Sequence, residues 1–151
     1  FRWGLWQADD NRHRMHDFVR QMTRWRQSMT HAVAPATYGG GAPFAWKSPS
    51  NGESVNWDGK AVMIHYFDAT AGPEFAILIN MERQTTTFTL PEGRTWHRVV
   101  DTQAYFDDAA YLSEEGRNGR QTYNVDLNAE VALGESYDAA GSSIVIVQAM
   151  P

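Results

Sequence analysis

The clearest pattern in the chain is a run of apolar residues at helical spacing between Arg12 and about Thr30. They follow one another at intervals of three, one, three, three and four positions, which places them on one stripe of a helix. The stripe consists of Met15, Phe18, Val19, Met22, Trp25 and Met29. Short polar side chains at 9–11 provide N-cap chemistry for the first turn. The pattern therefore predicts one amphipathic helix.

A helix with one polar face must pack its apolar stripe against another part of a protein. No second run with a matching stripe occurs elsewhere in the sequence. The partner of the stripe is therefore either a sheet formed by this chain or a protein body outside it.

After the helix, Pro35 ends the helical region, and Gly39-Gly40-Gly41 with Pro43 forms a flexible connector. Short apolar or alternating segments follow, separated by turn signals such as Asp58-Gly59. The expected strands are 44–47, 54–57, 61–68, 74–80, 85–90, 96–101, 123–127 and 143–148. Strands at short spacing without helices between them favour an antiparallel β-sandwich. The fold class predicted is mainly β, a sandwich preceded by one amphipathic α-helix.

Composition narrows the possible partners. The chain has 151 residues, no cysteine and a net charge of -5, so it lacks the basic surface of a general nucleic-acid binder. No apolar run approaches the length of a membrane span, and no signal peptide is visible. The sequence does not indicate the cellular compartment. Several of the six Trp residues lie in polar, turn-rich stretches, where indole rings can stack on sugars, although most are expected in the core.

Motifs that would carry chemistry are weak. His13 and His16 lie one helical turn apart but have no obvious third metal ligand. The segment from Gly134 to Asp138 lacks the second glycine of a nucleophile elbow. The acidic residues of the long polar insertion at 103–124 lack calcium-loop spacing. No carboxylate pair is placed for glycoside cleavage, so we expect no catalytic residue, no metal and no cofactor in this chain.

A series of short motifs appears in a recognisable order. They are Phe1-Arg2-Trp3, Asp17-Phe18, Met22, Trp25-Arg26, Phe44-Ala45-Trp46, Asn56-Trp57, 77–80 ending in Asn80, Leu90-Pro91, Trp96, 99–102 and 142–147. In that order the chain resembles the C-terminal region of isoamylase-type glycogen and starch debranching enzymes, in the α-amylase family of glycoside hydrolases. It departs from the family pattern at Gly4 and at Gln27-Ser28.

The resemblance implies three segments. Residues 1–34 would be the last loop and helix of a (β/α)8 barrel, 35–43 a linker, and 44–151 the C-terminal β-sandwich. The whole enzyme would hydrolyse α-1,6 branches of glycogen, amylopectin or starch with an Asp and a Glu upstream of this chain. The partners implied are that catalytic barrel and the α-glucan, and Trp3 and Trp6 are candidate glucan contacts or, equally, packing residues. The competing interpretation is a free-standing carbohydrate-binding module, and a third is a domain that binds no sugar.

Overall fold

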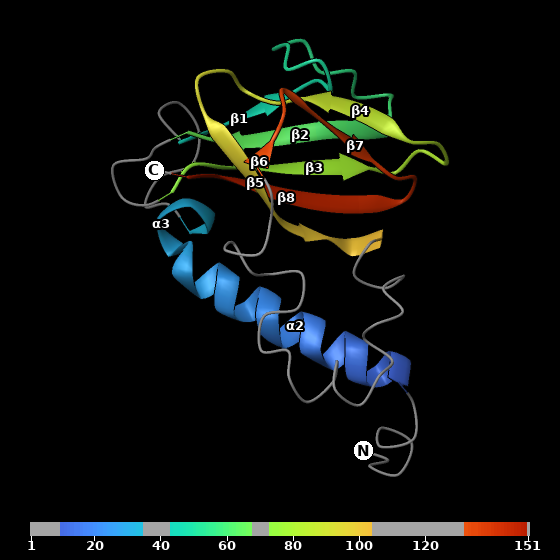
Figure 1. Ribbon diagram of the computed structural model, residues 1–151. Coiled ribbons are helices and arrows are strands. Elements are labelled where there is room, and N and C mark those ends of the chain that lie inside the picture. The colour runs from blue at the N-terminus through green and yellow to red at the C-terminus, as the bar shows by residue number, and fades with distance from the viewer. Residues whose placement is uncertain (1–9, 35–42, 68–72, 104–131, 151) are drawn as a thin grey trace.

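The computed structural model describes residues 10–34, 43–67, 73–103 and 132–150. These residues form a long helix, a one-turn helix and eight strands (Figure 1). The elements are α2 (Asp10–Ser28), α3 (Thr30–Val33), β1 (Phe44–Lys47), β2 (Ala61–Tyr66), β3 (Phe75–Asn80), β4 (Thr86–Thr89), β5 (Thr95–Asp101), β6 (Ala132–Leu133), β7 (Ser136–Ala139) and β8 (Ser143–Met150).

The strands build two antiparallel sheets. Six of them form the larger sheet in the order β1-β2-β3-β8-β5-β6, and β4 pairs with β7 in a smaller one. The closing strand β8 lies between β3 and β5, so the last described segment of the chain occupies the centre of the sheet (Figure 1). The protein is thus mainly β, with antiparallel sheets and a helix, which fits the predicted sandwich-like architecture.

Alternation along the central strands gives the larger sheet two apolar faces. On β3, Ala76 and Leu78 face the smaller sheet, where they share a buried cluster with Phe88 of β4 and Ala139 of β7. Trp96 and Val145 belong to the same cluster. The first core therefore lies between the two sheets, as in a sandwich.

The opposite face of the same sheet receives the helix. Phe75 of β3 and Ile146 of β8 join Val100 of β5 in a second buried cluster with Trp25 and Met29. A bulge between Arg98 and Val100 in β5 shifts the register at this point. The central strands read as continuous apolar runs because both of their faces are covered.

Two polar anchors fix the ends of the strands. The buried amide of Asn80 donates to the carbonyl oxygens of Gln84, Ala139 and Ala140, and its oxygen accepts from the backbone N–H of Glu82. This amide ties the end of β3 to the turn between β7 and β8. In the same way, the buried indole Nε1 of Trp96 donates to the carbonyl of Pro91 at 2.8 Å.

Most predicted strands are found within a few residues of their expected limits. The prediction of a strand at 54–57 is wrong. Residues 54–56 are irregular, and hydrogen bonds from Asp58 and Gly59 to Asn56 begin a turn there. The short strands β6 and β7 were not predicted, since polar Ser136 and Asp138 weaken the apolar signal of β7. The predicted strand at 123–127 and most of the predicted connector at 35–43 lie outside the described residues.

Candidate functional site

The apolar stripe of α2 is covered along only part of its length. Trp25 and Met29, near the C-terminal end, are buried against the sheet, and Phe18 and Met22 pack against them. Met15 and Val19, nearer the N-terminal end, are 50% and 54% exposed. Figure 1 shows the reason: the helix meets the sheets at its C-terminal end and runs away from them toward its N-terminal end. The chain's own sheet is thus the partner of the C-terminal half of the stripe, one of the two alternatives left open by the sequence.

The helix-facing side of the larger sheet also extends beyond the helix. Ile144 lies opposite Ile79 in the register of β8 and β3, on the face that carries Ile146. It is among the exposed large apolar side chains of the described residues. Ile144 is thus an exposed apolar residue on the side of the sheet that faces the helix.

A second exposed apolar feature lies on the edge strand β1. Trp46 of β1 and Trp57 in the following turn are 42% and 69% exposed. Their ring centroids are 5.5 Å apart with an interplanar angle of 66°, an edge-to-face arrangement. Two indoles are thus held together at the surface, at the sheet edge farthest from α2 in Figure 1.

Local hydrogen bonds fix the backbone that carries Trp57. The backbone N–H of Asp58 donates to Asn56 Oδ1 at 3.2 Å, and the N–H of Gly59 donates to the Asn56 carbonyl at 3.1 Å. Asn side chains commonly close turns in this way. The turn here carries Trp57 at the surface. Sequence reasoning assigned Trp57 to a strand, although its position between Asn56 and Asp58-Gly59 was a turn signal that indicates exposure.

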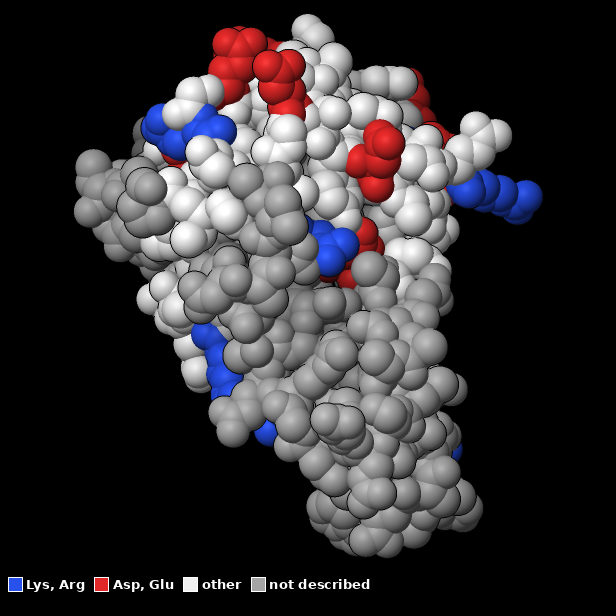
Figure 2. All heavy atoms as spheres, viewed as in Figure 1, with Lys and Arg blue, Asp and Glu red and all other residues white. Residues whose placement is uncertain are grey.

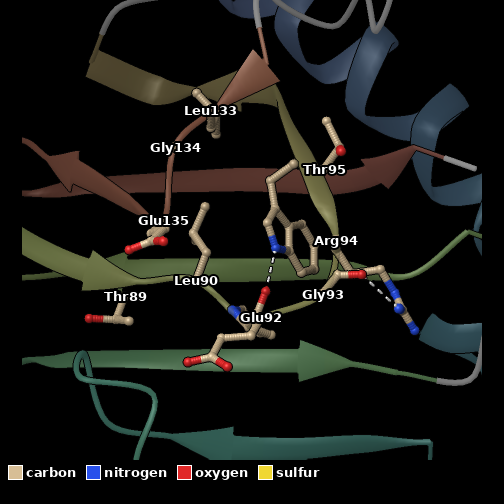
Figure 3. A pocket seen from close by; sticks show the side chains of 11 residues that line it. Thr89, Leu90, Glu92, Gly93, Arg94, Thr95, Leu133, Gly134 and Glu135 are labelled. Atoms are coloured by element: carbon tan, nitrogen blue, oxygen red, sulfur yellow. Dashed lines mark hydrogen bonds between the residues drawn. The ribbon is translucent and has the colours of Figure 1, made fainter.

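A groove of about 620 Å³ opens beside the first core. It is lined by the turn from Thr89 to Trp96 and by Leu133, Gly134 and Glu135 (Figure 3). In Figure 3 the side chain of Arg94 points away from the side chains of Glu92 and Glu135. The Trp96–Pro91 hydrogen bond forms part of the groove wall. The shape of the groove therefore depends on how this turn packs.

Arg94, one of the residues that line the groove, binds the buried carboxylate of Glu74. Its Oε1 is 2.7 Å from His65 Nε2, and its Oε2 accepts from Arg94 Nε at 2.5 Å. His65 also makes an edge-to-face contact with Trp96, with centroids 6.0 Å apart. Because both oxygens of Glu74 already have partners, this cluster is best explained as a polar anchor that closes the end of the sandwich.

Another polar cluster joins the two sheets. Tyr137 of β7 donates to Asp101 Oδ2 at 2.6 Å, and Arg98 Nη1 lies 3.4 Å from the Tyr137 hydroxyl. Burial and the hydrogen bond to Asp101 raise the pKa of Tyr137 from 10.0 to about 12. A tyrosine with a raised pKa keeps its proton at neutral pH, so it acts here as a hydrogen-bond donor between strands.

Other chemistry is not assembled in the described part of the chain. Within residues 10–34, 43–67, 73–103 and 132–150, no group of three His, Cys, Asp or Glu side chains is arranged to hold a metal ion. No helix in the same ranges is long and apolar enough to cross a membrane. On the face shown in Figure 2, acidic side chains gather over the sheets in the upper part of the view.

The sequence-predicted site residues Trp3 and Trp6 lie outside the described residues, as do the acidic residues of the polar insertion. Ser136, in the segment compared with a nucleophile elbow, is an exposed residue of strand β7. No protein-family model and no curated protein matches this chain.

Proposed function

We propose that this chain is the C-terminal region of an isoamylase-type α-glucan debranching glycoside hydrolase. In this role the chain carries no catalytic carboxylate itself. Its helix completes an upstream catalytic (β/α)8 barrel, and its sandwich covers and stabilises that barrel. The substrate of the whole enzyme is a branched α-glucan such as glycogen or amylopectin.

The observation that carries the proposal is the partial covering of the α2 stripe. A helix that served only this chain would place its whole stripe on the sheet. The stripe is instead buried at Trp25, while Met15 and Val19 remain about half exposed. A missing protein body on that side explains why the apolar pattern continues where the sheet no longer covers it. The burial of Trp25 goes against a stripe exposed along its entire length, so the docking surface is the N-terminal half.

The residues that carry the family resemblance offer secondary support. Asn80 and Trp96 are buried. The Asn80 amide bonds to Ala139 in a distant strand, and the Trp96 indole bonds to Pro91 within the turn that leads into β5. Structural roles of this kind suit a domain whose task is to support a neighbouring one.

Fragment complementation tests the proposal. The chain is mixed with the barrel of an isoamylase-type enzyme that has been truncated before its own last helix. We expect a one-to-one complex by size-exclusion chromatography and recovery of α-1,6 hydrolysis of amylopectin. The double variant Met15→Glu, Val19→Glu should weaken the complex at least about tenfold, because it places two charges in the interface.

Gln27→Glu provides the matched control. Gln27 is an exposed residue of the same helix, off the apolar stripe, so the added charge stays in solvent. This variant should bind the barrel as the unmodified chain does. Failure of the unmodified chain to bind the barrel, combined with retention on insoluble starch, would favour the free-standing carbohydrate-binding module instead.

For Trp3 and Trp6 the proposal assigns positions at the outer rim of the glucan groove, with packing between barrel and sandwich as the alternative. In the complete enzyme, Trp3→Ala distinguishes the two roles. Lower activity on long branched glucans at an unchanged melting temperature indicates stacking on glucose. A lower melting temperature without a change in substrate preference indicates packing.

A further inference from the structure

We infer that Trp46 and Trp57 form a binding site for the glucose units of a linear α-glucan segment. The site lies on edge strand β1 and the turn that follows it, and it is separate from the proposed barrel surface on α2. The exposure and the mutual contact of the two indoles define the stacking surface. The choice of an α-glucan as the ligand rests on the proposed function.

The pair is unusual because large aromatic side chains are mostly buried. Trp96 and Trp25 follow that rule, each packed in one of the two cores. Trp57, by contrast, is 69% exposed and contacts another indole, that of Trp46. One indole therefore supports the other, and ring surface remains available to a ligand.

The backbone that carries Trp57 is held in place before any ligand binds, which favours a binding role for the exposed ring. The hydrogen bonds of Asn56 hold the backbone on both sides of Trp57. The preceding loop is also fixed, since the N–H of Ser48 donates to the Gly52 carbonyl at 2.8 Å and the N–H of Gly52 donates to Ser48 Oγ at 3.0 Å. A rigid aromatic side chain loses little conformational entropy when a ligand binds, which raises the affinity.

The charges around the pair favour a neutral ligand. The segment from β1 to β2 contains two basic residues, Lys47 and Lys60, and two acidic residues, Glu53 and Asp58, and Lys47 is within 3.6 Å of Glu53. Stacking sites for single-stranded nucleic acid combine aromatic rings with a positively charged groove. The balanced charge here does not supply that field. A pyranose ring fits better, because its C–H face packs on an indole while its hydroxyls reach polar side chains.

The exposed polar residues Asn56 and Asp58 flank Trp57 in the sequence. Amide and carboxylate groups beside an aromatic ring can hydrogen-bond the hydroxyls of a stacked sugar. The arrangement is thus suited to one or two glucose units, and we expect weak binding of short oligosaccharides that is strengthened on polysaccharides by multiple attachment.

Affinity electrophoresis of the chain in native gels containing amylopectin tests the inference. The unmodified chain should be retarded, and Trp57→Ala should lower its apparent affinity about tenfold or more. Since Trp57 is largely exposed, the melting temperature of this variant should stay within about 2 °C of the unmodified chain. Trp57→Phe keeps a ring and should retain part of the retardation.

Gln27→Ala is the matched control, because it truncates an exposed side chain of α2 that lies off the apolar stripe, and it should leave retardation unchanged. The inference is overturned if amylopectin does not retard the chain, or if Trp57→Ala is retarded equally. Equal retardation by gels containing xylan overturns the assignment to α-glucans. Loss of barrel binding in Trp57→Ala would instead identify the pair as a protein interface. Barrel complementation is measured independently, so the proposed function can succeed or fail apart from this site.

Discussion

Trp25 of the helix and Phe75 of strand β3 meet edge to face, with ring centroids 5.1 Å apart and planes at 82°. This contact is the centre of the joint between helix and sheet, and Phe75 also stacks on Tyr66 at 4.4 Å. Two buried polar atoms in the described residues, Trp25 Nε1 and Gln148 Oε1, lack hydrogen-bond partners. Trp25 belongs to α2 and Gln148 to β8, so the Trp25 indole contributes to the contact between helix and sheet through its apolar ring.

Removal of the Trp25 ring should therefore be strongly destabilising. Trp25→Ala is expected to lower the free energy of unfolding by about 3–5 kcal/mol, because it leaves a cavity beneath the helix. Thermal or urea denaturation measures the effect. Val19→Ala, on the exposed half of the same stripe, should change stability by less than about 0.5 kcal/mol. A similar loss in both variants would contradict the uneven covering of the helix.

The Tyr137–Asp101 hydrogen bond gives a prediction about single-atom deletion. Tyr137→Phe leaves Asp101 without its 2.6 Å donor and should lower the free energy of unfolding by about 1–3 kcal/mol at neutral pH. Thr87→Val is the control, since Thr87 Oγ1 makes a bond of the same length to Asp138 on the exposed side of β4 and β7. That exposed bond should contribute less than about 0.5 kcal/mol, as measured by urea denaturation.

Alkaline pH provides a separate test of the same tyrosine. Below pH 10.0 both the folded and the unfolded chain keep the Tyr137 proton, whereas between pH 10.0 and about 12 only the folded chain keeps it. The folded state then binds more protons, so stability should fall as the pH rises through this window. Tyr137→Phe should show a shallower fall than the unmodified chain in the same denaturation series. Parallel curves for the two proteins would show that Tyr137 titrates normally.

Close packing of the β7–β8 turn predicts a severe effect from one methyl group. A Cβ added at Gly141 would collide with the backbone carbonyl of Arg83, a contact that no side-chain rotation can relieve. Gly141→Ala should therefore destabilise the chain by about 1–3 kcal/mol. At Gly134 an added Cβ meets nothing within 4 Å, so Gly134→Ala is the matched control. Thermal melts that rank the two variants equally would contradict the packing of this turn.

The buried Glu74 carboxylate should tolerate substitution poorly. Glu74→Gln removes the negative charge that faces Arg94, so the charge-assisted hydrogen bond from Arg94 Nε is weakened and stability falls by about 1–3 kcal/mol. Glu53→Gln alters an exposed partner of Lys47 at 3.6 Å and should have an effect below about 0.5 kcal/mol. Chemical denaturation of the two variants under identical conditions compares them directly.

Hydrophobic periodicity predicted a helix or strand correctly where its apolar residues lie on the same side or sides of the element. The stripe of α2 and the apolar runs of β2, β3, β5 and β8 were predicted because their spacing reflects burial directly. The segment 54–57 was misassigned because Val55 and Trp57 alternate with polar residues like a strand. The hydrogen bonds of Asn56 outweighed that alternation.

The candidate sites were harder to predict than the fold. The sequence singled out Trp3 and Trp6 from the family resemblance, whereas the structure draws attention to Trp46 and Trp57 because they are exposed and in contact. Whether these Trp residues are exposed depends on which strand lies at a sheet edge. Strand order cannot be predicted from the local sequence pattern. The polar anchors at Glu74 and Asp101 were likewise hidden, because their partners come from other strands.

The sequence by itself determined one amphipathic helix, a series of antiparallel strands and a net acidic chain, since local spacing and composition are enough for these features. Only the tertiary structure decided that β8 lies at the centre of the larger sheet, that α2 is covered at one end only, and that two indoles meet on an edge strand. Those relationships depend on contacts between residues far apart in the sequence. Their stability comes from burial and strand pairing between distant segments, and local sequence patterns do not predict which segments meet.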